Sequence, residues 1–110
     1  MKAIPLVLLV LLSLAASGWA GEIYGAIKEG GQPVKKAPVE IKAPNNKAYP
    51  GSTDDYGNYR IIVAETGKCT ITVTFNGQPT KGEVESYPTP VRFNWLLEKI
   101  PTGGYSLKRQ

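Results

Sequence analysis

The stretch Thr53–Ile61, which reads Thr-Asp-Asp-Tyr-Gly-Asn-Tyr-Arg-Ile, constrains the fold of this chain more than any other. Asp54 is suited to open a tight turn, and Gly57 can adopt a positive φ without steric cost. From Tyr59 to Val63 every second residue is apolar, which is the pattern of a half-buried β-strand. The stretch therefore predicts a turn followed by a strand with one face in a hydrophobic core.

Residues 1–20 are predicted to be a secretory signal peptide. Lys2 is followed by an apolar run from Ile4 to Leu14, and small residues precede a cleavage site after Ala20 or after Gly18. The apolar run has about 11 residues, fewer than the roughly 20 that a membrane-spanning helix needs. We therefore expect cleavage near Ala20, a periplasmic or secreted protein, and no stable membrane anchor.

The remaining residues, 21–110, are predicted to form one all-β domain. No part of this region has helical periodicity, and turn residues separate short alternating segments at the spacing typical of a sandwich. Asn76-Gly77 is a strong hairpin signal. The expected strands are 22–28, 38–43, 48–52, 58–63, 69–75, 91–97 and 105–108, with 82–87 as either an edge strand or a loop.

The composition argues against several classes of function. The chain has no histidine, which removes the commonest general base and a common zinc ligand. We therefore expect a protein that is not an enzyme and that needs no metal or cofactor. Removing Lys2 lowers the 13 basic residues to 12, against 9 acidic ones, for a net charge of +3. These charges are scattered without interleaved aromatic residues, so we expect no nucleic-acid partner.

Several motifs follow one another in a fixed order between Ile23 and Phe75. They are Gly25-Ala26-Ile27, Gly31-Gln32-Pro33-Val34, Ala37-Pro38-Val39-Glu40-Ile41, Thr53-Asp54, Gly57-Asn58-Tyr59, Ile61, Gly67 and Thr70-Ile71-Thr72-Val73. In this order and spacing they resemble the carboxypeptidase regulatory-like domain, a transthyretin-like β-sandwich of secreted bacterial proteins. The chain departs from that family's pattern at Lys36, where glycine is usual, and at Cys69, where an aromatic residue is usual.

The resemblance implies a seven-stranded antiparallel β-sandwich with a transthyretin-like fold. It also implies an accessory, structural or recognition role without peptidase activity, because the catalytic domain of such proteins is separate. A fold does not determine a function, so the likeness alone leaves the role of this chain open.

Three tyrosines in predicted turns or edges are the candidate binding residues: Tyr49, Tyr56 and Tyr87. Aromatic rings displayed on loops can stack on sugars or anchor a protein partner, although turn tyrosines also cover the ends of a core. We expect a non-catalytic domain that serves protein interaction or structural support at the cell envelope, with an envelope or extracellular protein as partner. The alternative is a carbohydrate-binding module that uses the loop tyrosines.

Two smaller sites have ordinary structural interpretations. Asp54, Asp55 and Asn58 could hold calcium, but their spacing is not that of an EF-hand, and a turn stabilised by Asp54 is the simpler interpretation. Cys69 is the only cysteine and could form an intermolecular disulfide. Its alternation with Ile71 favours a buried, unreactive thiol instead.

A third site would be a covalent cross-link between side chains. Lys28, Glu40 and Asn94 resemble, in residue type, the self-formed Lys–Asn cross-link of collagen-adhesin B-type domains. All three lie opposite the main apolar face of their predicted strands. We expect them to point to solvent, where such a bond does not form.

Overall fold

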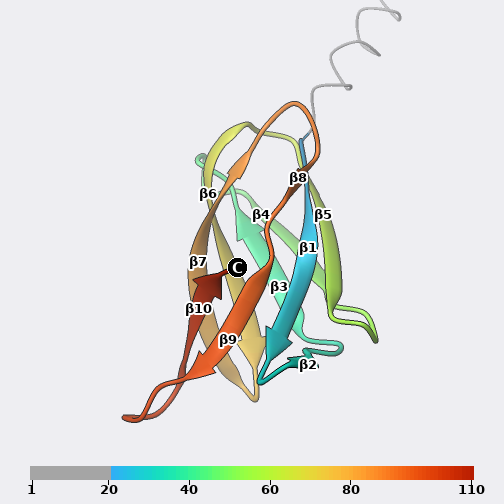
Figure 1. Cartoon of the computed structure of the whole chain (residues 1–110). Coiled ribbons are helices and arrows are strands. Elements are labelled where there is room, and N and C mark those ends of the chain that lie inside the picture. The colour runs from blue at the N-terminus through green and yellow to red at the C-terminus, as the bar shows by residue number, and fades with distance from the viewer. Residues whose placement is uncertain (1–20) are drawn as a thin grey trace, which may run out of the picture.

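The computed structural model describes residues 21–110, which form two β-sheets packed face to face as a sandwich (Figure 1). The signal peptide predicted for residues 1–20 lies outside the described residues. No helix within residues 21–110 has the length and hydrophobicity to cross a membrane. The strands are β1 (Gly21–Glu29), β2 (Gln32–Pro33), β3 (Pro38–Lys42), β4 (Ala48–Ser52), β5 (Asn58–Val63), β6 (Gly67–Phe75), β7 (Gln78–Ser86), β8 (Val91–Arg92), β9 (Trp95–Lys99) and β10 (Tyr105–Arg109).

Strand β1 is the centre of the first sheet and has two neighbours along each edge. On one edge it pairs antiparallel with β5 and then with the two-residue strand β2. On the other edge it pairs in parallel, first with β8 and then with β9. Strand β10 pairs antiparallel with β9 and completes the sheet.

The second sheet has the order β4-β3-β6-β7, and all of its pairs are antiparallel. The β6–β7 hairpin turns through Asn76 and Gly77, whose φ values of 52° and 76° are those of the predicted tight turn. Before β5, Oδ1 of Asp54 accepts hydrogen bonds from the amides of Tyr56 and Asn58 at 2.8 and 2.9 Å. Both predicted turns are confirmed.

The core between the sheets consists of the alternate residues that the sequence pattern selects. Trp95 is 2% exposed and Cys69 is 4% exposed, so both lie in the core as predicted. Burial of this set supplies most of the free energy that holds the two sheets together, at about 25 cal/mol per Å² of apolar surface. The core residues are Ile23, Ile27, Val34, Ala37, Val39, Ile41, Ala43, Tyr59, Ile61, Val63, Cys69, Ile71, Val73, Val84, Phe93, Trp95 and Leu97.

The predicted strand 91–97 is divided into β8 and β9. Where the ladder is interrupted, the amide of Phe93 donates to the Tyr24 carbonyl at 2.8 Å, and the amide of Ala26 donates to Oδ1 of Asn94 at 3.0 Å. A side-chain oxygen thus replaces a backbone carbonyl at this point. The alternation of apolar residues continues through the break, which is why the sequence pattern does not reveal it.

The uncertain segment 82–87 belongs to β7, a nine-residue strand paired along its whole length with β6. Its inward positions are mostly small or polar, with Thr80 and Ser86 buried on either side of Val84. Gly82 leaves space for Trp95, because a Cβ at this position would come within 2.9 Å of the indole ring. The large residue that fills this part of the core comes from β9, so β7 carries little hydrophobic signal of its own.

The prediction of a seven-stranded antiparallel sandwich therefore needs two corrections. Residues 21–110 contain ten strands, because β2 and β8 are separate short pairings and β7 is a full strand. The first sheet is mixed, since β1 runs parallel to β8 and β9. The all-β class and the two-sheet arrangement are as predicted.

A buried tyrosine holds the interrupted edge of the first sheet. The hydroxyl of Tyr59, on β5, donates to the carbonyl oxygen of Phe93 at 2.6 Å and accepts from Nε1 of Trp95 at 3.3 Å. Gly25 of β1 pairs with Tyr59. A Cβ at Gly25 would collide with the Phe93 carbonyl, so only glycine lets this carbonyl approach β1 so closely.

We expect Gly25→Ala to destabilise the domain by about 2–3 kcal/mol, because the added methyl group meets backbone atoms in a packed interior. The matched control is Gly51→Ala on β4, where the new Cβ meets side-chain atoms of Ile61 instead of backbone atoms. Urea denaturation of both variants measures the difference. Equal stability losses in the two variants would contradict the role given to Gly25.

Candidate functional site

Tyr49 is occupied by contacts within its own domain. It lies on β4, packs against the core, and its hydroxyl donates a 2.6 Å hydrogen bond to Oε1 of Glu65. This bond raises the pKa of Tyr49 and lowers the pKa of Glu65. The Nζ of Lys47 lies 5.6 Å from the centroid of the Tyr49 ring. These contacts give Tyr49 a structural role on this sheet.

Tyr56 and Tyr87 lie near opposite ends of the sandwich. Tyr56 is 77% exposed in the β4–β5 turn, and Tyr87 is 42% exposed in the loop after β7. Tyr56 precedes Gly57, whose carbonyl oxygen accepts a hydrogen bond from the amide of Ile27 in β1. Tyr87 lies beside Gly21 at the start of β1, where a Cβ would meet the Tyr87 backbone. Six residues of extended β1 separate these two points, about 20 Å. The structure does not gather the three predicted tyrosines into one surface.

The remaining sites weighed from the sequence are structural. Burial raises the pKa of the Cys69 thiol, which makes it a weak nucleophile. Lys28 and Glu40 are exposed and lie on different sheets, on β1 and β3, so they do not meet Asn94 in a buried cross-link. Within residues 21–110 there is no group of three or more histidine, cysteine, aspartate or glutamate side chains that could hold a metal ion.

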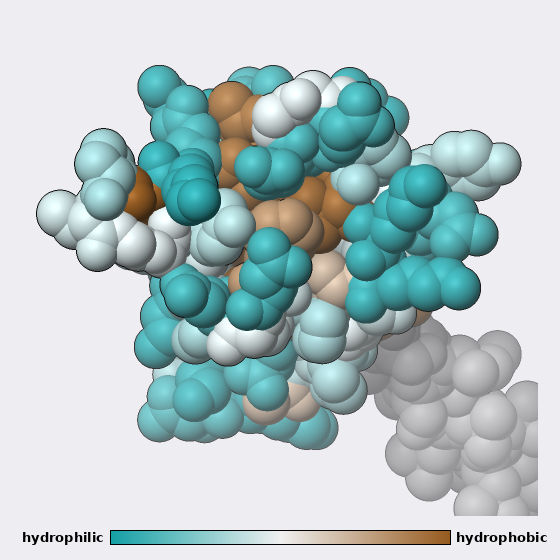
Figure 2. All heavy atoms as spheres, turned by 90° about the horizontal axis from the view of Figure 1, so that it is seen from below, coloured by the Kyte–Doolittle hydropathy of each residue, from teal (hydrophilic) through white to brown (hydrophobic). Residues whose placement is uncertain are grey.

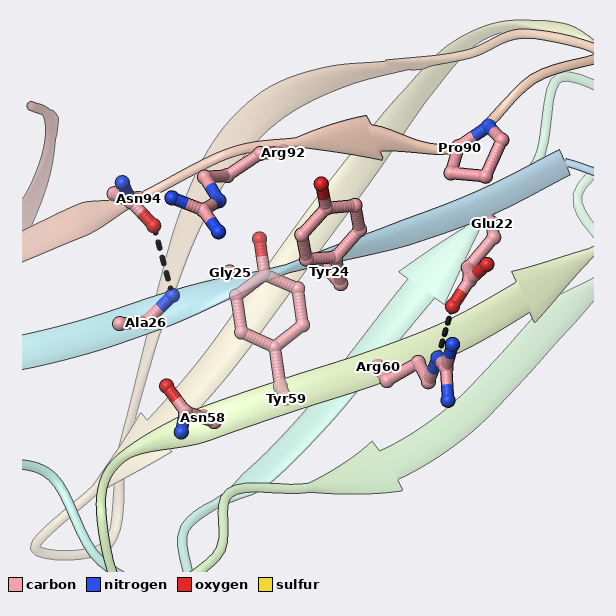
Figure 3. Close-up of a pocket in the computed structure, with 10 residues that line it drawn as sticks. All are labelled: Glu22, Tyr24, Gly25, Ala26, Asn58, Tyr59, Arg60, Pro90, Arg92 and Asn94. Atoms are coloured by element: carbon pink, nitrogen blue, oxygen red, sulfur yellow. Dashed lines mark hydrogen bonds and ion pairs between the residues drawn. The ribbon is translucent and has the colours of Figure 1, made fainter.

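A groove of about 600 Å³ lies on the outer face of the first sheet, on the side away from the core (Figure 3). Strands β1 and β5 contribute their outward-facing residues, and β8 with the segment that follows it forms the opposite side. None of the three predicted tyrosines borders this groove. Its polar and aromatic outward-facing residues are Glu22, Tyr24, Asn58, Arg60, Arg92 and Asn94.

Tyr24 supplies the aromatic surface of the groove. It lies opposite Arg92 in the parallel β1–β8 register, and the guanidinium carbon of Arg92 is 5.4 Å from the centroid of the Tyr24 ring. Figure 3 shows the Arg92 side chain reaching from β8 over β1. A cation–π contact at an exposed site contributes about 0.5–1 kcal/mol. It also restrains both side chains in one arrangement.

An ion pair lies along the β5 side of the groove. Nε of Arg60, on β5, donates to Oε2 of Glu22, on β1, as Figure 3 also shows. The Arg60 side chain is 74% exposed, and an ion pair of this kind adds at most about 1 kcal/mol to stability. Its main effect is to balance one positive and one negative charge within the groove.

The floor of the groove is low because Ala26 has only a methyl group. Asn58 lies opposite Ala26 in the β1–β5 register, and Asn94 lies across from them on the other edge of β1. The Oδ1 of Asn94 accepts the Ala26 amide, which fixes the side chain and leaves its NH₂ group as a donor. The floor therefore offers amide hydrogen-bonding groups beside the Tyr24 ring.

A smaller cavity of about 350 Å³ adjoins the other side of Arg92. Tyr87 borders this cavity, and the guanidinium of Arg109 stacks 4.3 Å from the centroid of the Phe93 ring. The charged lining residues are Lys68, Glu83, Glu85, Arg92 and Arg109. Arg92 therefore stands between two concave surfaces.

The groove has the chemical groups of a binding site for a polar molecule. An aromatic face, two amides, two guanidinium groups and one carboxylate surround a hollow that is open to solvent. Ligand sites generally combine an apolar or aromatic surface with a few fixed polar groups, as here. Glu22 is the only carboxylate among the described lining residues, whereas glycosidases use two.

No family model and no curated protein sequence matches this chain. Solved structures do resemble it. A DUF3823 family protein from Parabacteroides merdae superposes with a TM-score of 0.55 at 9% identity, over 82% of this chain and 46% of that protein. A candidate carbohydrate-binding protein from Bacteroides uniformis has a TM-score of 0.53 at 13% identity, over 80% and 52%. The enzyme (S)-allantoin synthase has a TM-score of 0.53 at 15% identity, over 86% and 45%.

These likenesses establish a β-sandwich fold and no more, because the identities are low. The chain spans about half the length of each of these proteins or slightly less. One of the three is an enzyme and one is a candidate carbohydrate-binding protein, so the fold accommodates different functions.

We expect the stability of the domain to fall by about 2 kcal/mol between pH 10 and pH 12. Burial raises the pKa of Tyr59 to about 12 from an ordinary value of 10.0. The folded protein thus holds this proton more tightly than the unfolded chain does. The resulting stabilisation is complete below about pH 10 and is lost as the pH rises through 12.

Urea denaturation at several alkaline pH values tests this expectation, with Tyr59→Phe as the control. The variant should be less stable at neutral pH by about 1–3 kcal/mol, because it loses a buried hydrogen bond. It should then lose less stability on going to pH 12. The same alkaline loss in both proteins would assign the effect to other groups.

Proposed function

We propose that this protein is an exported, non-catalytic binding domain whose groove on β1, β5 and β8 binds carbohydrate. We further propose that it belongs with the carboxypeptidase regulatory-like, transthyretin-like sandwiches, and that it acts in the periplasm or outside the cell. The order of motifs from Gly25 to Val73 and the signal-peptide pattern of residues 1–20 support these assignments.

The contact between Tyr24 and Arg92 is the single observation that carries the carbohydrate proposal. It presents a restrained aromatic ring next to the side-chain amides of Asn58 and Asn94. Sugars have apolar C–H faces that pack on aromatic rings, and hydroxyl groups that pair with amides and charged groups. The groove brings both kinds of surface together. The likeness to a candidate carbohydrate-binding sandwich is in keeping with this proposal.

A non-catalytic role is proposed from the residues themselves. The sequence contains no histidine, and the only cysteine is buried with a raised pKa. The groove has one carboxylate, which is paired with Arg60. A pair of nucleophile and base is therefore lacking among the groove residues that the structure describes.

An envelope or extracellular protein partner is the second candidate function. Figure 2, which views the molecule from below, supports it by showing hydrophobic residues gathered in the middle of that end and ringed by hydrophilic ones. Exposed apolar area with a polar rim is characteristic of protein contact sites. The outward face of β5 adds Ile62, which is 61% exposed.

An array of envelope and plant polysaccharides, probed with purified protein comprising residues 21–110, tests the groove. We expect saturable binding to at least one polysaccharide, and we expect Tyr24→Ala to weaken it by about tenfold or more, equivalent to about 1.4 kcal/mol. Ala26→Leu should also weaken binding by filling the floor.

Tyr56→Ala and Tyr87→Ala serve as matched controls, because both remove a tyrosine ring outside the groove. They should bind like the unaltered protein. Loss of binding in these variants with full binding by Tyr24→Ala would move the site to the loops. A folded protein that binds no polysaccharide would overturn the carbohydrate proposal and leave the protein partner.

A further inference from the structure

The two arginines of the groove differ in their electrostatic surroundings. Arg60 is paired with Glu22, so its charge is largely balanced. The ion pairs found among residues 21–110 are this one and Lys36 with Asp55, and neither includes Arg92. The lining therefore has two positive groups and one negative group, a local charge of +1 centred on Arg92.

Arg92 is held in place without its charge being balanced. The guanidinium carbon lies over the Tyr24 ring at 5.4 Å from its centroid, and no hydrogen bond or ion pair among residues 21–110 uses the N–H groups of Arg92. A guanidinium presents these donors in a planar fork that matches the two oxygens of a carboxylate. A cation–π contact with Tyr24 and donation to a carboxylate can therefore occur together.

The neighbouring groups extend the recognition of an anion. The NH₂ group of Asn94 is a further donor on the same side of the groove, since its Oδ1 is used by the Ala26 amide. On the other side of Arg92, the positive charges of Lys68 and Arg109 in the smaller cavity are balanced by the carboxylates of Glu83 and Glu85, so the excess positive charge of this region is that of Arg92. The net charge of the whole domain has the same sign. This charge favours the approach of acidic polymers.

We propose that the groove is selective for acidic saccharides and that Arg92 binds the carboxylate of a uronic-acid residue. The sugar ring packs on Tyr24, and its carboxylate accepts two hydrogen bonds from the Arg92 fork. This inference rests on the proposed carbohydrate function and names the class of sugar. No covalent step is involved.

The test compares oligogalacturonate with its methyl ester, which has the same sugar ring but lacks the negative charge. Isothermal titration with the protein comprising residues 21–110 should give at least tenfold tighter binding of the acid form. Raising the salt concentration should weaken binding of the acid form more than binding of the ester.

Three variants locate the effect. Arg92→Gln should remove the preference, lowering affinity for the acid form by about tenfold or more, so that the acid form binds no more tightly than the ester. Arg92→Lys should recover only part of the preference, because lysine lacks the planar fork. Lys81→Gln makes the same charge change on an exposed position of β7 in the other sheet, and should leave the preference intact.

The outcomes separate this inference from the proposed function. Equal binding of the two forms, unaffected by Arg92→Gln but lost in Tyr24→Ala, would overturn the selectivity and keep the carbohydrate site. An equal loss of preference in Lys81→Gln would assign it to net charge and overturn the role of Arg92. A protein that shows a thermal unfolding transition, and is therefore folded, but binds neither form would overturn the selectivity for uronic acids. The polysaccharide array would then still decide whether the groove binds carbohydrate.

Discussion

The hydrogen bond from the Tyr59 hydroxyl to the Phe93 carbonyl is the constraint on which the rest of this structure depends. It joins β5 to the segment between β8 and β9, passing the inner face of β1 where Gly25 has no side chain. At this segment the hydrogen-bond ladder that joins β8 and β9 to β1 is interrupted. What would be a single strand becomes two short parallel pairings on the same edge of β1.

The interruption also determines the outer surface. With Phe93 turned into the core, Arg92 and Asn94 on either side of it reach the outer face beside Tyr24 and Ala26. At the same break the Asn94 side chain accepts the Ala26 amide, which fixes one of the groups of the groove. A buried interaction on one side of the sheet and a candidate binding site on the other have a common origin.

Much of the fold follows from local sequence. Alternation from Tyr59 to Val63, the Asp54 turn and Asn76-Gly77 each identify an element that the structure contains. The parallel pairing of β1 with β8 and β9 could not be predicted in this way, because it joins residues far apart in the chain. Likewise β7 has little hydrophobic signal, since Trp95 fills the space over Gly82.

The candidate site was harder to predict than the fold. Aromatic residues in predicted loops and edges are the candidates that the sequence offers, and they are Tyr49, Tyr56 and Tyr87, which the structure places apart. Tyr24 lies within a strand, at an outward position that the pattern assigns to solvent, and Arg92 resembles any surface charge. The pairing of β1 with β8 gives them a common site. The one sequence signal for the groove is Tyr24 itself, an aromatic residue at an outward position of a strand whose inward positions are buried in the core.

The most direct measurement of the central claim is an NMR titration of the ¹⁵N-labelled domain with oligogalacturonate, followed by amide chemical shifts. If the groove is the site, the largest changes fall on residues 22–26, 58–60 and 92–94, which come from β1, β5 and the segment that begins in β8 and together surround the groove. Changes confined to the β4–β5 turn or to the loop after β7 would place binding at the predicted loop tyrosines and contradict this account.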